Sequence, residues 1–272
     1  MKKIFVLMIL FSSWISSQSI EYFPNELNIS PFMANPIESR MGFMFKTAGN
    51  ELHLNIGNTM DLAWISTKSG MISIGADFFT WTLLRKEENF HFPVDAVDYL
   101  FGLNFGFKRT AHDYSFGTRV RLSHISAHMV DGHFDKTKYI WLNGQMPRVY
   151  SREFLELTPF YQYRGLRMYF GFTYLFHVDP DVTRKDQYQA GFDYVRKDFI
   201  CANVSPYVAF DARLTNRFAE SPNISFQGGI KIGKQFGRGL SVYYTYYSGV
   251  SPHGEYYDFR EKYSGIGLNL DL

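Results

Sequence analysis

The chain has 272 residues, of which 46% are hydrophobic and 18% aromatic, and its formal net charge is +2. This length fits one large domain or two small ones, and the nearly balanced charge argues against a nucleic-acid partner. After the N-terminus no segment holds about 18 consecutive apolar residues, so we expect no transmembrane helix.

The first 19 residues are typical of a secretory signal peptide. Lys2 and Lys3 supply a positive start, residues 4–11 form a short apolar run, and small residues at Ser17 and Ser19 suit a cleavage site. We therefore expect an exported protein whose mature chain starts near residue 20. Residues 20–39 contain three prolines and are expected to form an extended periplasmic segment before the first strand.

From residue 40 onward, apolar and polar residues alternate with a period of two. In segment 166–178, one side carries Leu166, Met168, Phe170, Phe172, Tyr174, Phe176 and Val178. The other side carries Arg167, Tyr169, Gly171, Thr173 and His177, with Leu175 as the exception. Segments 99–108, 223–234 and 264–272 alternate in the same way. Alternation this regular predicts β-strands with one face against apolar surroundings.

Those apolar surroundings could be the core of a soluble β-sandwich or the lipid around a membrane barrel. Strands of about ten residues or more exceed the usual length in globular sheets, and the aromatic side chains suit the girdles of membrane barrels. A closed barrel also satisfies every backbone polar group in lipid. We therefore predict an all-β protein, with a transmembrane antiparallel β-barrel of the outer-membrane type over residues 40–272.

Counting the alternating segments gives about twelve strands, an even number as in bacterial single-chain barrels. They are expected to begin near residues 40, 51, 70, 98, 114, 152, 166, 187, 203, 223, 240 and 262. Short links alternate with longer ones, which predicts short periplasmic turns, long external loops and both termini in the periplasm. We expect a monomer that is inserted by the barrel-assembly machinery and contacts outer-membrane lipid and lipopolysaccharide.

The polar side of the strands carries charges of both signs, and this side would face the lumen of the barrel. By parity the inward charged residues are Asp77, Lys108, Arg119, Arg121, Glu156, Arg164, Arg167, Asp193, Asp211, Arg213 and Lys231. Because buried charges must be paired, these residues could form a plug of ion pairs. Alternatively, they could line a charged constriction that selects small solutes.

The stretch "RLSHISAHMVDG" at residues 121–132 breaks the pattern, because parity puts His124, Ser126 and His128 on the apolar side. Nucleophilic catalysis needs a hydroxyl beside a base that a third group orients. His124 and Ser126 share a face about 6.6 Å apart, and Glu153 on the next strand has the same outward parity. One hypothesis therefore makes Ser126 a nucleophile, His124 its base and Glu153 the orienting group.

These histidines have two other interpretations. Histidine and serine near a membrane interface can simply contact lipid headgroups or the loop above them. A zinc site is disfavoured because His124 and His128 are about 13 Å apart along a strand. The sequence holds no phosphate-binding glycine loop or zinc-like cysteine and histidine spacing, so we predict neither a metal nor another cofactor.

Several stretches resemble a family of bacterial outer-membrane barrels known as Domain of Unknown Function 1207. They are "NISPFMANPIESRMGF", "RLSHISAHMVDG", "RVYSREFLEL", "SPYVAFDARL", "SPNISFQGGIKIG" and "YYSGVSPHGEYYDFREKYSGIGLNLDL". The resemblance implies an outer-membrane barrel and no known activity.

The pair His124 and Ser126 is also similar to the strand-borne dyad of the outer-membrane phospholipase A family. That family has a twelve-stranded barrel with an outward-facing site, in which an asparagine orients the histidine. The resemblance implies His124 as base and Ser126 as nucleophile. The sequence departs from that pattern, because Ala127-His128 follows the serine in place of Asn-Gly and no matching asparagine is present. From the sequence we favour a non-enzymatic barrel, a narrow pore or a structural surface protein, over a lipid-acting hydrolase.

Overall fold

The computed structural model of the chain describes residues 19–38, 40–182, 184–215 and 222–272. The signal peptide predicted at residues 1–19 lies almost entirely outside the described residues. Within the described ranges, no helix is both long and apolar enough to cross a membrane. Apart from four short 3-10 segments, the regular structure there is entirely β.

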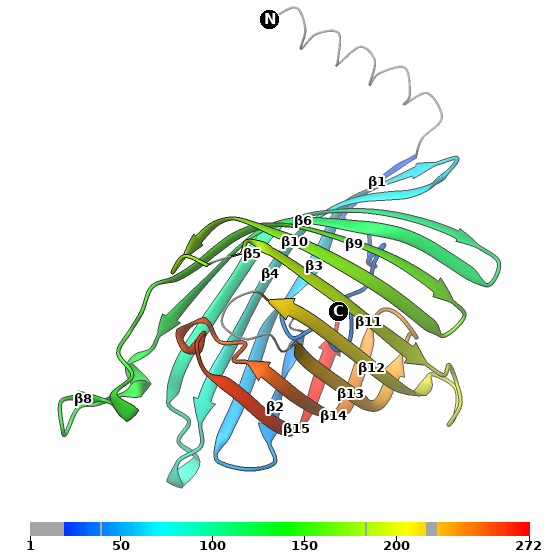
Figure 1. Cartoon of the computed structure of the whole chain (residues 1–272). Coiled ribbons are helices and arrows are strands. Elements are labelled where there is room, and N and C mark those ends of the chain that lie inside the picture. The colour runs from blue at the N-terminus through cyan, green and yellow to red at the C-terminus, as the bar shows by residue number, and fades with distance from the viewer. Residues whose placement is uncertain (1–18, 39, 183, 216–221) are drawn as a thin grey trace, which may run out of the picture.

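Twelve antiparallel strands form a closed barrel, which confirms the predicted fold (Figure 1). In chain order they are β2 (Met41–Lys46), β3 (Glu51–Thr67), β4 (Gly70–Arg85), β5 (Val94–Ala111), β6 (Tyr114–Met129), β9 (Tyr150–Tyr163), β10 (Leu166–Asp179), β11 (Asp186–Val195), β12 (Val204–Thr215), β13 (Asn223–Gly233), β14 (Gly239–Val250) and β15 (Arg260–Asp271). Strands adjacent in this order are hydrogen-bonded, and β15 pairs with β2 to close the barrel. The largest error in a predicted strand start is at β5, which begins at Val94 and not at residue 98.

The two ends of the barrel differ in the connections they carry. One end, the turn end, has short links such as 68–69, 112–113 and 164–165. The other end, the loop end, has longer ones, above all residues 130–149 with the hairpin β7 (Phe134–Asp135) and β8 (Ile140–Trp141). The short strand β1 (Ile20–Tyr22) pairs with the last part of β3, so β1 and the end of β15 both lie at the turn end.

The 3-10 segments all belong to the loop end. They are η1 (Glu88–Phe90), η2 (Asp131–His133), η3 (Leu142–Gly144) and η4 (Gly254–Tyr256). Segment η4 belongs to the connection between β14 and β15, and it folds onto the ends of β6 and β9. Its Glu255 accepts hydrogen bonds from the backbone N–H groups of Met129 and Arg148, at 2.8 and 2.9 Å. Two long connections are therefore tied together at this end.

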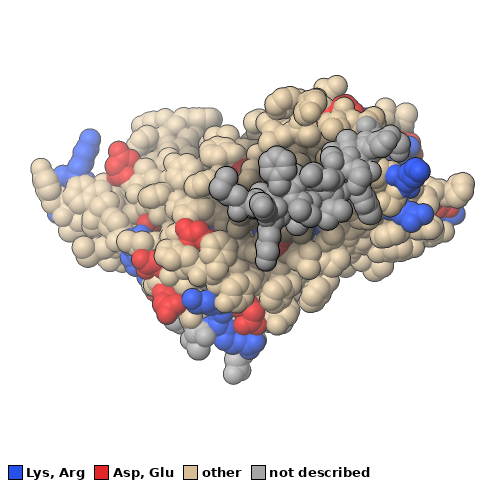
Figure 2. Space-filling model, turned by 90° about the horizontal axis from the view of Figure 1, so that it is seen from above, with Lys and Arg blue, Asp and Glu red and all other residues tan. Residues whose placement is uncertain are grey.

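The barrel buries polar side chains and exposes apolar ones. On β10, Phe170 is 50% exposed while Arg167 is 2% exposed. Most of the surface visible in Figure 2 is uncharged. A water-soluble barrel would place apolar side chains inside and polar ones outside. The reverse arrangement found here is that of a barrel with lipid around its wall and a polar interior. The alternation in the sequence is therefore an alternation between lipid-facing and lumen-facing positions.

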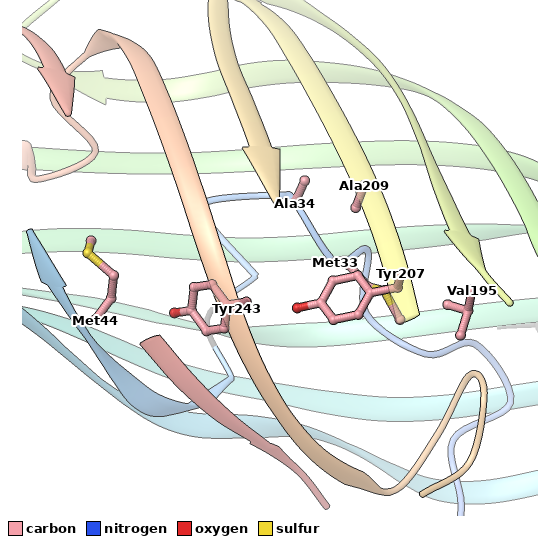
Figure 3. Close-up of a cluster of buried hydrophobic side chains, with 7 residues drawn as sticks. All are labelled: Met33, Ala34, Met44, Val195, Tyr207, Ala209 and Tyr243. Atoms are coloured by element: carbon pink, nitrogen blue, oxygen red, sulfur yellow. The ribbon is translucent and has the colours of Figure 1, made fainter. Parts of the chain in front are cut away.

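Residues 28–38 lie inside the barrel and do not form a separate segment before it. The Asn28 N–H donates to Asp61 at 2.7 Å, and the Met33 N–H donates to Asp193 at 3.0 Å. Figure 3 shows Met33 and Ala34 of this segment close to side chains of the barrel wall, including Tyr207 of β12. The segment has no alternation of its own, so the pattern that revealed the strands could not reveal its place in the lumen.

Candidate functional site

The buried charges of the lumen form one network around the N-terminal segment. Glu38 is fully buried between Arg119 and Arg121 of β6, and its carboxylate lies 3.1 Å from Arg121 Nη1. Arg121 Nε is also 3.0 Å from Asp77 of β4. The Phe32 N–H donates to Glu38 at 2.9 Å. The carboxylate of the segment therefore compensates two arginines of the wall and fixes the segment within the lumen.

The structure places nearly all of the charged residues expected inside the barrel in its interior. Buried there are Asp77, Arg119, Arg121, Glu156, Arg167, Asp193, Asp211, Arg213 and Lys231. Lys108 is half-buried and donates to the backbone oxygen of Asn28 at 2.8 Å. Arg164 is a correction, because it lies in the exposed turn between β9 and β10 and pairs with Asp113 at 3.2 Å. The alternation of side chains between two faces holds only within a strand, so it does not predict the direction of a residue in a turn.

His124, Ser126 and His128 lie on the outer face of β6, where parity placed them. The alternate residues Ser123, Ile125 and Ala127 are buried, whereas His124 and Ser126 are half-exposed and His128 is exposed. No bulge is found between β5 and β6 or between β6 and β9. The polar side chains are therefore a feature of the outer wall and not the result of a register change.

Glu153 of β9 lies directly opposite His124 in the ladder. Its Oε1 is 2.6 Å from His124 Nδ1, and both side chains are about one-quarter exposed, at 27% and 26%. A carboxylate can only accept a hydrogen bond from this nitrogen, so Nδ1 carries the proton and Nε2 is left as the basic nitrogen. The orienting group proposed from the sequence thus contacts the proposed base.

Ser126 lies beside this pair but is not hydrogen-bonded to it. The residue opposite Ser126 on β9 is Ser151, whose hydroxyl donates to Glu153 at 3.4 Å. Among the described residues, no hydrogen bond joins Ser126 to His124. The two side chains are one same-face step apart on the strand, about 6.6 Å. Catalytic contacts of free enzymes are often long and tighten only when substrate binds.

Sequence reasoning missed His177, which belongs to the same cluster. Strict alternation predicts His177 on the inner side of β10 and Val178 on the outer side, but a β-bulge between Leu175 and His177 reverses the parity. An extra residue on one strand re-aims the side chains that follow it. His177 therefore faces outward, where its Nδ1 contacts the second carboxylate oxygen of Glu153, and Val178 packs against inner residues. The only sign in the sequence was the apolar pair of Leu175 and Phe176.

Aromatic rings border the cluster on the side of β5. The Phe101 ring is 4.9 Å from the His124 ring, and the Tyr99 ring is 5.8 Å from the His128 ring. Across the described part of the chain, no set of histidine, cysteine, aspartate and glutamate side chains is arranged to hold a metal ion. The cluster is thus a carboxylate between two imidazoles, with hydroxyls beside it and apolar rings around it.

Comparison with known proteins identifies one family and one fold. The family model described as "Protein of unknown function (DUF1207)" matches residues 97–272. The outer membrane phospholipase A from Escherichia coli has 14% identity and a TM-score of 0.55, with 91% of this chain and 95% of that chain covered. The Salmonella typhi outer membrane phospholipase, solved as a dimer with bound calcium, has 12% identity and a TM-score of 0.55, with 90% and 94% covered. No curated protein matches. At such identities the likeness shows the fold alone.

Proposed function

The chain belongs to the DUF1207 family, and from its outward-facing cluster we propose that it is an outer-membrane hydrolase that cleaves acyl esters of membrane lipids. Ser126 is the nucleophile, His124 its base and Glu153 the group that orients the base. The observation that carries the proposal is the hydrogen bond of 2.6 Å between His124 and Glu153 on the lipid-facing wall. The sequence favoured a non-enzymatic barrel, and this contact is the reason for preferring the hydrolase.

The carboxylate–imidazole pair has no part in the charge network of the lumen. Ionised side chains on the lipid face destabilise a membrane barrel, although less so near the interface, so the pair does not serve the stability of the barrel wall. The pair does have the geometry of a base and its orienting group, because Nδ1 is held by a carboxylate and Nε2 is free to accept a proton. A hydroxyl follows on the same face of the strand.

The proposed reaction proceeds through an acyl-serine. The Ser126 oxygen attacks the carbonyl carbon of the ester while His124 Nε2 takes the hydroxyl proton. His124 then gives that proton to the leaving alcohol, and the acyl group stays on Ser126. A water molecule, deprotonated by His124, attacks the acyl-serine; the bond to Ser126 then breaks, the fatty acid leaves and His124 returns the proton to the Ser126 oxygen. Glu153 stabilises the imidazolium in both steps.

The position of the cluster favours lipids of the outer leaflet as substrates. Ser126 is close to the end of β6, at the barrel end that carries the long connections. In bacterial outer-membrane barrels the long loops are external and the short turns periplasmic, so both termini would lie in the periplasm. Phospholipid and lipopolysaccharide are then the acyl esters within reach. Two solved barrels with this fold are named phospholipases, which supports the proposal only through the shared fold.

Covalent labelling tests the proposal without knowledge of the substrate. We expect a fluorophosphonate with an alkyl chain to modify the detergent-solubilised protein at Ser126, as mapped by peptide mass spectrometry. Ser123 is the matched control, because it lies on the same strand but is buried on the inner face. Labelling that persists in Ser126→Ala, or no labelling of the native protein, would sink the proposed nucleophile.

Changes at Glu153 separate an orienting role from a structural one. Glu153→Gln keeps one oxygen that can accept from His124 Nδ1 but loses the negative charge that stabilises the imidazolium, so we expect the hydrolysis rate to fall by about 10²-fold or more. Glu153→Ala removes the acceptor, and we expect a loss of about 10²–10⁴-fold, as when other orienting residues are removed. His177→Ala keeps the bond between Glu153 and His124 and should change the rate only a few-fold. Native hydrolysis rates in both Glu153 variants would contradict the assigned role.

The contents of the lumen weigh against the alternative, a narrow pore. Residues 28–38 and the buried ion pairs around Glu38 occupy the interior. We expect the mature chain to leave planar lipid bilayers without conductance steps, because conduction requires a continuous hydrated path. Regular single-channel steps from the pure protein would restore the pore as the better function.

A further inference from the structure

A cavity inside the barrel, separate from the outward-facing cluster, contains an incompletely compensated charge. We infer that this cavity binds a small organic carboxylate with an apolar body. It is lined by Arg152 and Arg213, by the apolar side chains of Ile125, Phe154 and Leu175, and by Pro252 of the connection between β14 and β15. The proposal does not depend on the hydrolase, because these side chains face the lumen and Ser126 faces outward.

Arg152 of β9 is a buried positive charge with no carboxylate of the described residues within ion-pair distance. It is 3% exposed, and its Nη1 donates to the backbone oxygens of Ser151 and Asp179. The Tyr150 ring lies 4.2 Å from the guanidinium carbon, but Tyr150 carries no formal charge, and Arg152 Nη2 is buried without a hydrogen bond of its own. The other buried arginines in the described part of the chain each have a carboxylate within ion-pair distance, whereas Arg152 has none. A buried guanidinium without a counter-charge is costly, so an anion is the partner this position lacks.

Arg213 of β12 supplies a second donor on the same cavity. Its Nη2 donates to Gln189 at 2.8 Å and to Glu156 at 3.4 Å, but its Nε is buried and unpartnered. Asp211 also lines the cavity. Its Oδ2 accepts hydrogen bonds from Tyr169 Oη at 2.7 Å and from Gln189, so its negative charge is shared with these two donors. Two arginines thus each offer an unused N–H group, which matches the two oxygens of one carboxylate.

One side of the cavity is apolar, whereas polar side chains such as Thr173, Gln187 and Ser225 line other parts of it. Ile125, Phe154 and Leu175 belong to one buried apolar cluster contributed by β6, β9 and β10. The cavity measures about 110 Å³, somewhat smaller than the roughly 150 Å³ apolar cavity that accepts benzene in an engineered protein. A monoanion with a short, flexible apolar chain, such as hexanoate, therefore suits the cavity better than a rigid ring, and a hydrated inorganic phosphate would gain nothing from the apolar side chains.

Isothermal titration of the mature, detergent-solubilised chain with hexanoate tests the inference. We expect saturable one-to-one binding, no binding of the neutral hexanamide, and weaker binding of inorganic phosphate. Arg152→Gln should weaken hexanoate binding by about tenfold or more, because the positive charge that would pair with the hexanoate carboxylate is lost. Arg164→Gln is the matched control, since Arg164 lies in an exposed turn, and it should bind as the native chain does.

A second variant protects the test against loss of folding. Ile125→Phe narrows the cavity and leaves both arginines in place, so it should also weaken hexanoate binding while the barrel keeps its heat-modifiable migration in gels. The inference is overturned if the native chain does not bind hexanoate, or if hexanamide or phosphate binds as tightly as hexanoate. It is also overturned if correctly folded Arg152→Gln binds hexanoate with native affinity.

Discussion

Ser126→Ala is expected to lower the rate of fatty-acid release from phospholipid or lipopolysaccharide by about 10³-fold or more, because removal of a catalytic nucleophile leaves only the contributions of binding and electrostatics. Ser126 is half-exposed on the lipid-facing wall, so the substitution removes one surface hydroxyl and creates no cavity. We therefore expect the barrel to keep its stability. The measurement compares native and variant protein in detergent micelles and follows the released fatty acid.

The matched control is Ser151→Ala, because Ser151 lies opposite Ser126 and already donates to Glu153. If Ser126 is the nucleophile, loss of the Ser151 hydroxyl should change the rate only a few-fold. If Ser151→Ala abolishes release while Ser126→Ala does not, the nucleophile has been assigned to the wrong strand. Equal rates for native protein and both variants would end the hydrolase hypothesis.

Glu38→Ala is expected to destabilise the barrel by about 3–5 kcal/mol, the range seen when one partner of a buried ion pair is removed. Glu38 is fully buried, and its carboxylate compensates both Arg119 and Arg121. It also accepts hydrogen bonds from the Phe32 N–H and the Asn35 side chain, both at 2.9 Å. Alanine would leave two buried arginines with less counter-charge and release the segment that fills the lumen. Chemical unfolding from micelles, followed by gel migration, measures the change.

A carboxylate outside the barrel provides the comparison for Glu38. Glu26 pairs with Lys234 at the turn end, and about half of each side chain is exposed. Exposed ion pairs contribute little because water and salt screen them, so Glu26→Ala should change stability by less than about 1 kcal/mol. If the Glu38 and Glu26 variants unfold at the same denaturant concentration, the N-terminal segment is not held in the lumen by its charge.

The candidate site shows how far a strand pattern can be followed along the chain. Parity placed His124 and Ser126 on the outer face and suggested Glu153 as their neighbour, because side chains on a strand alternate strictly between two faces. The same reasoning misplaced His177, because the single extra residue at the bulge in β10 moves each following side chain to the opposite face of the sheet. The contact between Glu153 and two histidines therefore could not be read from spacing alone.

The fold followed from local chemistry, whereas the contents of the barrel did not. Alternating apolar and polar residues determined the strands, their approximate starts and the closed antiparallel barrel, because period-two burial and backbone hydrogen bonding in lipid leave few other solutions. Only the tertiary structure decided that residues 28–38 occupy the lumen, that Glu38 lies between Arg119 and Arg121, and that Arg152 remains without a carboxylate. These contacts join residues far apart in the chain, and no periodicity encodes which distant charges will meet.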